Sequence, residues 1–176
     1  MTADSISLNI STPSEPIAPG RGFYQLEEEA LFVQVGQFAS RRRFFSYLDS
    51  DGIRLDFDRL GRLIFIEVDI SRRLWPVDPS LKPPEIVEPA DIRWLHFRNS
   101  VPIPELHTNE RKTLVKLAFQ QINDPLNYYA AQSIIVQTGR DYRLAALWIT
   151  DIIDDIAGQE IGAFRKGIRA YESYYV

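Results

Sequence analysis

Residues 53–68 read IRLDFDRLGRLIFIEV and match, without a gap, residues 134–149, which read IIVQTGRDYRLAALWI. Among the other positions, those of Leu55, Ile64, Phe65, Ile66 and Val68 stay apolar in the second stretch. A segment that recurs in this way indicates a fold built twice from one small unit. The sequence therefore predicts a duplicated β-hairpin. The identical positions include Ile53 and Ile134, Arg59 and Arg140, Arg62 and Arg143, and Leu63 and Leu144.

The alternation within residues 53–68 predicts how the hairpin pairs. A two-residue turn at Leu60-Gly61 suits glycine, which readily takes the positive φ that such turns require. Arg54 then lies opposite Glu67 on one face, and the other face is wholly apolar. A slip of one residue would scatter the apolar side chains over both faces, so the buried face fixes the pairing. The apolar face comprises Ile53, Leu55 and Phe57 opposite Val68, Ile66 and Ile64.

Both faces of the second stretch are apolar. On its outer face, Ile135 and Trp148 stand where the first stretch has Arg54 and Glu67. Exposure of such a face would promote aggregation, so we expect another element to cover it. Residues 153–175 carry apolar residues at helical spacing. We predict that this helix, or the same surface of a second subunit, covers Trp148. Leu144 and Ala146 complete the apolar face, and the helical stripe comprises Ile153, Ile156, Ala157, Ile161, Phe164, Ile168, Tyr171 and Tyr175.

The chain as a whole predicts a mainly β (α+β) fold. Two related β-meander units form one sheet system or sandwich, closed by a C-terminal amphipathic helix with Asp151 as its N-cap. The first residues are rich in Ser, Thr and Pro, although Ile6, Leu8 and Ile10 alternate and allow one edge strand. The expected segments are a flexible N-terminal arm at 1–20, a first β unit at 21–75, a Pro-rich linker at 76–90, a second β unit at 91–152 and the helix at 153–176.

Composition limits the classes of function. The 176 residues are 45% hydrophobic and 25% charged, as in an ordinary globular protein. There is no cysteine, which excludes disulfides, a thiol nucleophile and a thiolate metal site. The sequence shows neither a long apolar run nor a signal peptide, so we expect a cytoplasmic protein with no membrane partner. A net charge of −4 argues against general nucleic-acid binding.

The stretch YQLEEEALFVQV, which begins at Tyr24, and DGIRLDFDRLGRLIFIEV at residues 51–68 resemble the DUF2283 family of uncharacterised small β proteins. The shared pattern is a tyrosine, an acidic stretch, alternating apolar residues, an Asp/Gly turn and a Gly-Arg-Leu-x-x-Ile-Glu strand. The resemblance covers about residues 23–70, with a degenerate second copy at about 113–152. It implies a compact β-meander and no known activity. Phe65 departs from the family, which usually has glycine there, and an insertion with three arginines separates the strands.

Acidic side chains on the first hairpin are one candidate for chemistry. Asp56, Asp58, Glu67 and Asp69 lie on or near one face, and paired carboxylates can bind a divalent cation or act as acid and base. The alternative is a solvated outer face on which Arg54 pairs with Glu67. The segment Asp49-Ser50-Asp51-Gly52 resembles the start of a calcium loop but lacks its later ligands, so we interpret it as a hairpin turn.

Basic and aromatic residues give weaker candidates. Arg41–Arg43 could contact phosphates, but acidic residues are interspersed downstream, which favours a self-paired surface. His96 and His107 could supply a general base, with a surface or half-buried role as the alternative. Glu160 lies at the edge of the helical stripe, either as a catalytic carboxylate or reaching solvent. The tryptophans Trp75, Trp94 and Trp148 line a ligand pocket or belong to the core.

These observations favour a non-enzymatic interaction or assembly module, with a homodimer as the expected form and another protein partner as an option. No residue is assigned to a catalytic, cofactor or metal site, and no cofactor is expected. One alternative is a metal-dependent enzyme that uses the Asp56, Asp58 and Glu67 face. The other is a nucleic-acid-associated regulator that acts through Arg41–Arg43.

Overall fold

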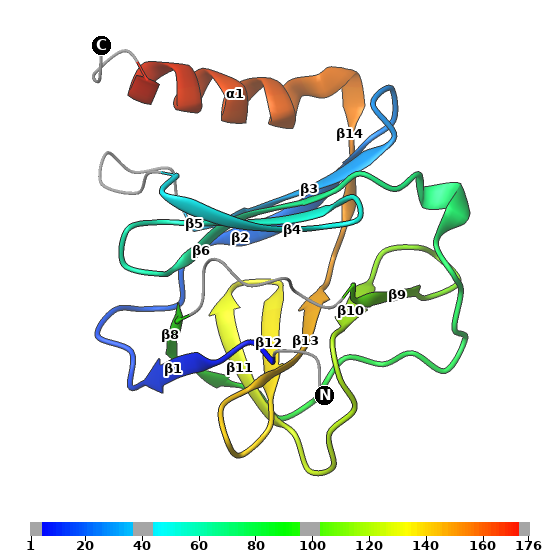
Figure 1. Ribbon diagram of the computed structural model, residues 1–176. Helices are drawn as coiled ribbons and strands as arrows, with labels where there is room; N and C mark the ends of the chain where they lie inside the picture. Colours follow the sequence, from blue (N-terminus) through cyan, green and yellow to red (C-terminus); the bar gives the residue numbers. More distant parts are fainter. Residues whose placement is uncertain (1–4, 37–43, 96–102, 173–176) are drawn as a thin grey trace.

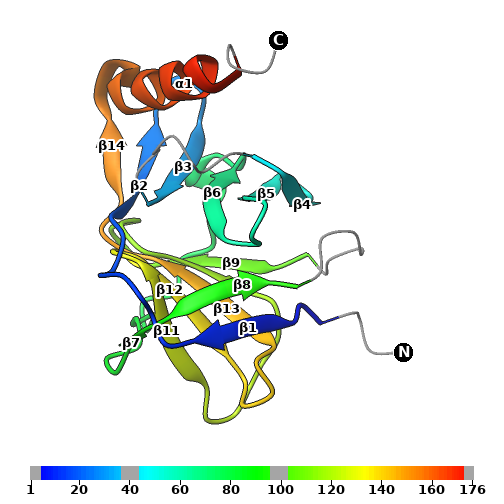
Figure 2. The ribbon, with the colours of Figure 1, turned by 90° about the vertical axis from the view of Figure 1, so that its left-hand side faces the viewer.

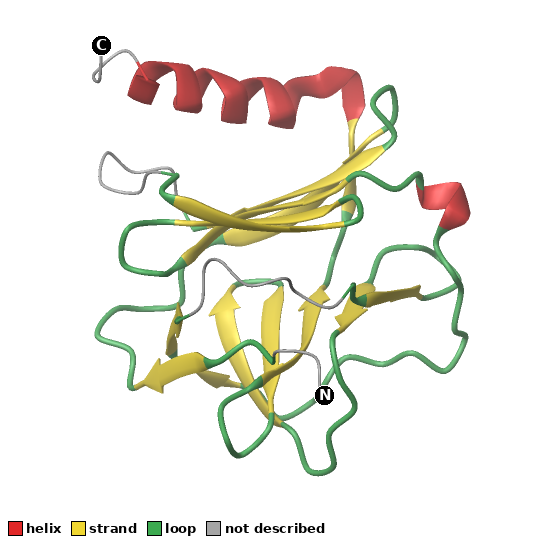
Figure 3. Ribbon diagram, in the orientation of Figure 1, coloured by secondary structure: helices red, strands yellow, loops and turns green. Residues whose placement is uncertain are grey.

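Two six-stranded β-sheets face each other across a shared core, and one helix lies on the outer side of the first sheet (Figure 1). The computed structural model describes residues 5–36, 44–95 and 103–172, except for the side chains of residues 164 and 167–172. Apart from the helix and two short 3₁₀ turns, the regular structure is β (Figure 3). The mainly β fold with a C-terminal helix is therefore confirmed.

The first sheet combines strands from the first half of the chain with one strand near its end. All its neighbours are antiparallel except β14, which runs parallel to β2. In spatial order the strands are β14 (Ile153–Asp155), β2 (Gly20–Gln25), β3 (Ala30–Val35), β6 (Leu63–Val68), β5 (Ile53–Phe57) and β4 (Ser46–Ser50).

The second sheet follows the same plan. Its strands are antiparallel except β7, which runs parallel to β11. In spatial order they are β7 (Glu88–Pro89), β11 (Leu126–Ala131), β12 (Ile134–Thr138), β13 (Leu144–Ile149), β10 (Val115–Ala118) and β9 (Glu105–Thr108). The order β11-β12-β13-β10-β9 thus corresponds strand for strand to β4-β5-β6-β3-β2 of the first sheet.

The two central hairpins also share their pairing. Ile53 lies opposite Val68 as Ile134 lies opposite Ile149, and Arg54 lies opposite Glu67 as expected. Each hairpin changes register at the corresponding place, between 56 and 57 in the first and between 137 and 138 in the second. Such a bulge inserts one extra residue on the opposing strand and increases the local twist.

The bulge corrects part of the predicted pairing. Phe57 lies opposite Leu63 and not opposite Ile64, which therefore moves to the outer face of the sheet. In the second hairpin Leu144, expected on the outer face, lies in the inner core for the same reason. The turn is also longer than two residues, because the amide N–H of Asp58 donates to the Arg62 carbonyl oxygen at 2.9 Å.

The core lies between the sheets and takes apolar side chains from both. Except at the two bulges, alternate residues of the central strands point inward, because successive side chains of a strand point to opposite faces. Full burial of one such aliphatic side chain stabilises the fold by about 1.5–3 kcal/mol. A single cluster joins both units, so they form one folding unit around one interior. Its largest fully buried members include Trp94, Phe57, Leu31, Ile66, Leu117, Ile134, Leu147 and Ile149.

Part of the segment expected as a flexible arm at 1–20 forms regular structure and packs on the core. Strand β1 (Leu8–Ser11) pairs with β8 (Asp91–Trp94) in a separate two-stranded sheet, as the alternation had allowed. The side chains of Ile6 and Leu8 are buried in the core. Their backbones bond to the turn of the β12–β13 hairpin, since the Ile6 carbonyl oxygen accepts the N–H of Leu144 at 2.8 Å.

The C-terminal segment differs from the predicted helix at 153–176. Its first residues form β14, a 3₁₀ turn η2 (Ile156–Gly158) follows, and helix α1 (Gln159–Glu172) begins only then. The N-terminal cap is Asp155 rather than Asp151: the N–H groups of Glu160 and Ile161 donate to its carboxylate at 2.8 and 3.1 Å. Within the part that the structure describes, no helix is long and apolar enough to cross a membrane.

The helix covers the first sheet, not the second. Ile161 packs against an outer cluster formed by Phe23, Ala30, Phe32, Ile64 and Phe65, and the helix lies above this sheet (Figures 1 and 2). Trp148 is buried, as predicted, but its cover is different. Residues Leu81 and Val87 of the Pro-rich linker 76–90 pack on the cluster that contains it. The side chain of Phe164 lies outside the described part of the chain.

Candidate interaction surface

The three carboxylates proposed for metal chemistry do not converge. Asp58 is buried in the hairpin turn, where its Oδ1 accepts hydrogen bonds from the N–H groups of Leu60 and Arg62, both at 2.9 Å. Asp56 and Glu67 lie on the outer face of the sheet around Arg54. Among the described residues, no group of three or more His, Cys, Asp or Glu side chains is placed to hold a metal ion.

Arg54 binds a different acid from the one predicted. Although Glu67 is directly opposite, the Nε of Arg54 lies 3.2 Å from Oδ1 of Asp56 on its own strand. Its guanidinium also covers the ring of Tyr47, 4.1 Å from the centroid. Burial raises the pKa of Asp56 above its ordinary value, and the pKa of Glu67 is raised by burial and by the charge of Asp69.

The raised pKa of Asp56 predicts a pH-dependent contribution to stability. The folded state binds the proton at a higher pH than the unfolded state does, so the penalty for the buried charge is present at neutral pH. It disappears as pH falls through the folded pKa toward the ordinary value of 3.8. We therefore expect the parent protein to gain stability relative to Asp56→Asn between about pH 7 and pH 4 in urea unfolding. A constant difference would contradict this assignment.

Four arginines of the first unit lie beside acids, in keeping with a self-paired surface, whereas Arg59 lies over the ring of Phe45. The four ion pairs are Arg54 with Asp56, Arg62 with Asp91, Arg72 with Asp154 and Arg73 with Glu29. The triplet Arg41–Arg43 and His96 lie outside the described residues. His107 sits on β9 with its Nε2 3.4 Å from Oε2 of Glu105, and Glu160 is exposed at the start of the helix.

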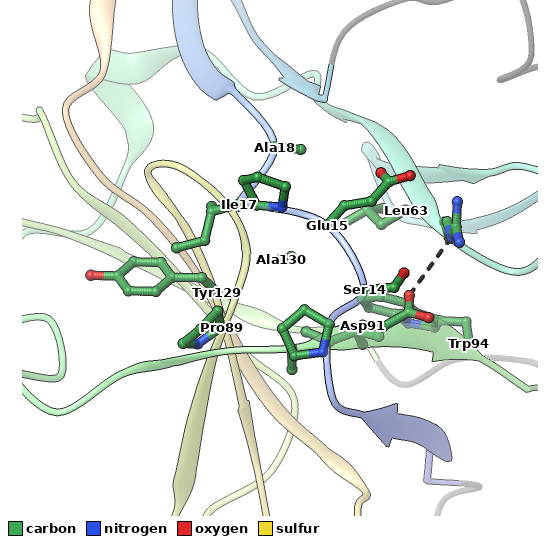
Figure 4. A pocket seen from close by; sticks show the side chains of 15 residues that line it. Ser14, Glu15, Ile17, Ala18, Leu63, Pro89, Asp91, Trp94, Tyr129 and Ala130 are labelled. Carbon is green, nitrogen blue, oxygen red and sulfur yellow. Dashed lines mark ion pairs between the residues drawn. The ribbon is translucent and has the colours of Figure 1, made fainter.

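A small cavity lies beneath the segment that links β1 and β2 (Figure 4). It encloses about 90 Å³ and is bounded by residues 13–18, β8 and the β5–β6 turn. Arg62 and Trp94 line it, and their Nε and Nε1 atoms are buried N–H groups that find no hydrogen-bond partner among the described residues. Arg62 Nε is 3.7 Å from Asp91 Oδ1. A water molecule fills about 30 Å³, so the cavity has the size and polarity for a few bridging waters.

The three tryptophans belong to the interior. Trp75 donates its indole N–H to the carbonyl oxygen of Ile70 at 2.9 Å and meets Tyr24 edge to face. Trp148 lies under Lys116, whose Nζ is 5.0 Å from the ring centroid. Trp94 alone of the three is both a core residue and part of the cavity wall. The core interpretation of these residues is therefore the one that the structure supports.

The four edge strands of the two sheets differ in length and in cover. Strands β14 and β7 are parallel additions of only three and two residues, and such short edge strands offer little for further pairing. On β9, Thr108 forms a parallel bridge with Val77, and its N–H donates to the carbonyl oxygen of Pro76 at 2.9 Å. Strand β4 is the longest of the four, with five residues, and its outer side is paired with none of the described residues. It lies at the opposite end of the first sheet from β14 (Figure 2).

The open edge of β4 carries aromatic side chains at its surface. Phe45 and Tyr47 are 62% and 52% exposed. Leu48, which follows Tyr47 and points into the core, is buried. An exposed strand edge presents unpaired backbone N–H and C=O groups, which is the geometry that accepts another strand. Sequence reasoning missed this feature, because edge position depends on the order of strands in the sheet and not on local pattern.

Comparison of the chain with protein-family models, with curated proteins and with solved structures gave no match.

Proposed function

We propose that this protein is a non-enzymatic interaction or assembly module that binds a protein partner by strand addition at the β4 edge, with a second copy of the chain as the favoured partner. The observation that carries the proposal is that β4 is the longest of the four edge strands and that its outer side is paired with none of the described residues. Long open edges otherwise promote aggregation, and the other edge strands are shorter or bridged. The exposed aromatic residues beside the edge are the types enriched at interfaces.

The proposal predicts that proline at position 49 abolishes or weakens association. Proline lacks the N–H group but is tolerated on an edge strand whose N–H faces solvent. In a symmetric dimer two hydrogen bonds of about 0.5–1.5 kcal/mol each are lost, which weakens association roughly tenfold or more. Sedimentation equilibrium of the full chain measures this effect.

The matched control is Asp49→Ala, which removes the same carboxylate but keeps the backbone donor. We expect it to lose only the small contribution of an exposed charge, so that the difference between Asp49→Pro and Asp49→Ala reports the lost backbone hydrogen bonds. Equal association of the parent, Asp49→Pro and Asp49→Ala would show that the β4 edge is not the interface, and a parent that stays monomeric at all concentrations would reject the homodimer.

The shared strand order and the matching bulges support the interpretation that the two units arose by duplication of one β-meander. The DUF2283 resemblance over residues 23–70 is in keeping with such a unit and adds no activity to the proposal. We further propose a cytoplasmic location, which agrees with the absence of cysteine.

If the protein were a metal-dependent enzyme, a bound cation would stabilise its folded state. We do not expect this stabilisation. Asp58 already accepts two backbone hydrogen bonds, and Asp56 is paired with Arg54, so few carboxylate oxygens remain for a cation. Millimolar calcium or magnesium should leave the melting temperature of the protein almost unchanged. A rise of several degrees in a thermal melt would favour the enzymatic alternative. A salt-sensitive shift with DNA or RNA would instead favour the alternative that acts through Arg41–Arg43.

A further inference from the structure

The hairpin turn before β5 fixes which backbone groups of β4 face outward. Asp51 and Gly52 both have positive φ, 46° and 87°, which defines a two-residue turn of the mirror-image type. Such a turn is closed by hydrogen bonds between the residues that flank it, Ser50 and Ile53. On the side that faces β6, the Gly52 carbonyl oxygen accepts the N–H of Asp69 at 2.7 Å. Gly52 and Ile53 therefore direct their backbone groups to opposite sides of the strand.

Hydrogen bonding alternates along an antiparallel pair. Ser50, Leu48 and Ser46 therefore direct their backbone groups toward β5, and Tyr47 and Asp49 direct theirs to the open edge. None of the described residues forms a hydrogen bond with the backbone of Tyr47 or Asp49 across this edge. The edge thus offers a ladder of two residues, each with one donor and one acceptor.

We propose that β4 pairs with β4 of a second copy in an antiparallel register that sets Tyr47 opposite the partner's Asp49 and Leu48 opposite the partner's Leu48. The inference rests on the proposed function and specifies its partner and geometry. A twofold axis that relates two identical strands in one sheet makes them antiparallel. Only the odd-numbered residues of β4 direct their backbone groups to the open edge. An allowed register must therefore pair an odd-numbered residue with an odd-numbered residue of the partner.

Three such registers exist, and two of them are unfavourable. Pairing Asp49 with the partner's Asp49 sets like charges directly opposite each other, which is destabilising. Pairing Tyr47 with the partner's Tyr47 would place Phe45 opposite the partner's Asp49, but the N–H of Phe45 already donates to the Phe57 carbonyl oxygen at 2.9 Å. The proposed register avoids both problems. In it, the N–H and the carbonyl oxygen of Tyr47 and of Asp49 all form hydrogen bonds with the partner strand.

Side chains on both faces suit this register. On the outer face the carboxylate of Asp49 lies beside the partner's Tyr47, whose ring is covered by the partner's Arg54 as in the free chain at 4.1 Å. An acid on one copy therefore meets a cation on the other. On the inner face Leu48, 5% exposed, meets the partner's Leu48 and extends the apolar row across the seam. The two first sheets become one continuous sheet.

Disulfide trapping tests the register directly, because the chain has no cysteine of its own. The variant that combines Tyr47→Cys with Asp49→Cys places the two thiols opposite each other at a Cα separation of about 5.5 Å, within disulfide range. Each single variant leaves its two thiols about 7–8 Å apart on the diagonal, beyond that range. Under mild oxidation we expect a linked dimer from the double variant on a non-reducing gel, and little from either single variant.

The result separates the register from the function. A linked dimer from Tyr47→Cys alone or Asp49→Cys alone would establish another register and overturn this inference, while the proposed function stands. The inference also falls if no variant is linked although sedimentation shows a dimer and circular dichroism shows folded chains. If the parent is a monomer in sedimentation, the homodimer itself fails, and the register fails with it.

Discussion

Replacement of Trp148 by alanine should lower the free energy of unfolding by about 3–5 kcal/mol, the range for removing a buried aromatic side chain. The residue is 4% exposed and packs with Leu114, Ile135 and Ala146 on the outer face of the second sheet. Its indole N–H also lies 3.4 Å from Oε1 of Gln137. Urea unfolding followed by circular dichroism measures the change, and a loss below about 1 kcal/mol would contradict the burial.

Double-mutant cycles identify what covers Trp148. Leu81 of the Pro-rich linker packs on the same cluster, whereas Ile161 of the helix packs on the first sheet. The change Trp148→Ala should therefore couple to Leu81→Ala by about 0.5–3 kcal/mol and be additive with Ile161→Ala within about 0.5 kcal/mol. Coupling to Ile161 and none to Leu81 would restore the helix as the cover.

Local pattern was sufficient to predict the first hairpin. The alternation in residues 53–68 has one register that makes one face of the hairpin wholly apolar, and the structure pairs Arg54 with Glu67 as that register requires. The pattern does not reveal the bulge, because residues 63–66 are all apolar and there is no polar residue among them to mark a change of face. Ile64 and Leu144 were placed on the wrong faces for this reason.

The cover of each sheet could not be predicted from pattern, since it depends on where distant segments pass. An apolar outer face around Trp148 indicated that something must cover it, and the amphipathic helix was the longest apolar element available. The linker 76–90 lacks a periodic pattern, yet Leu81 and Val87 reach the cluster. The open edge of β4 is hidden in the same way, because each strand has the same local pattern whether or not it has two neighbours.

Loss of the carboxylate of Asp155 should destabilise the protein by about 2 kcal/mol, near the upper end for an N-terminal cap. The residue is 1% exposed, and its two oxygens accept the N–H groups of Glu160 and Ile161. In Asp155→Ala both donors lose their partner, and the N–H of Ile161 does so in a buried setting, which costs more than loss of a solvated cap. Because the cap fixes the start of α1, the outer cluster with Phe32 should also become more accessible.

Asp154→Ala is the matched control, one residue away on the same strand. Asp154 lies 2.6 Å from Arg72 but is 45% exposed, so this surface ion pair contributes about 0–1 kcal/mol. Chemical denaturation should rank the parent and Asp154→Ala close together and Asp155→Ala well below them. Asp155→Ser, which keeps one acceptor oxygen, should recover part of the loss. If Asp154→Ala and Asp155→Ala are equally stable, the buried cap does not hold the helix, and its docking on the first sheet depends on Ile161 and its apolar neighbours alone.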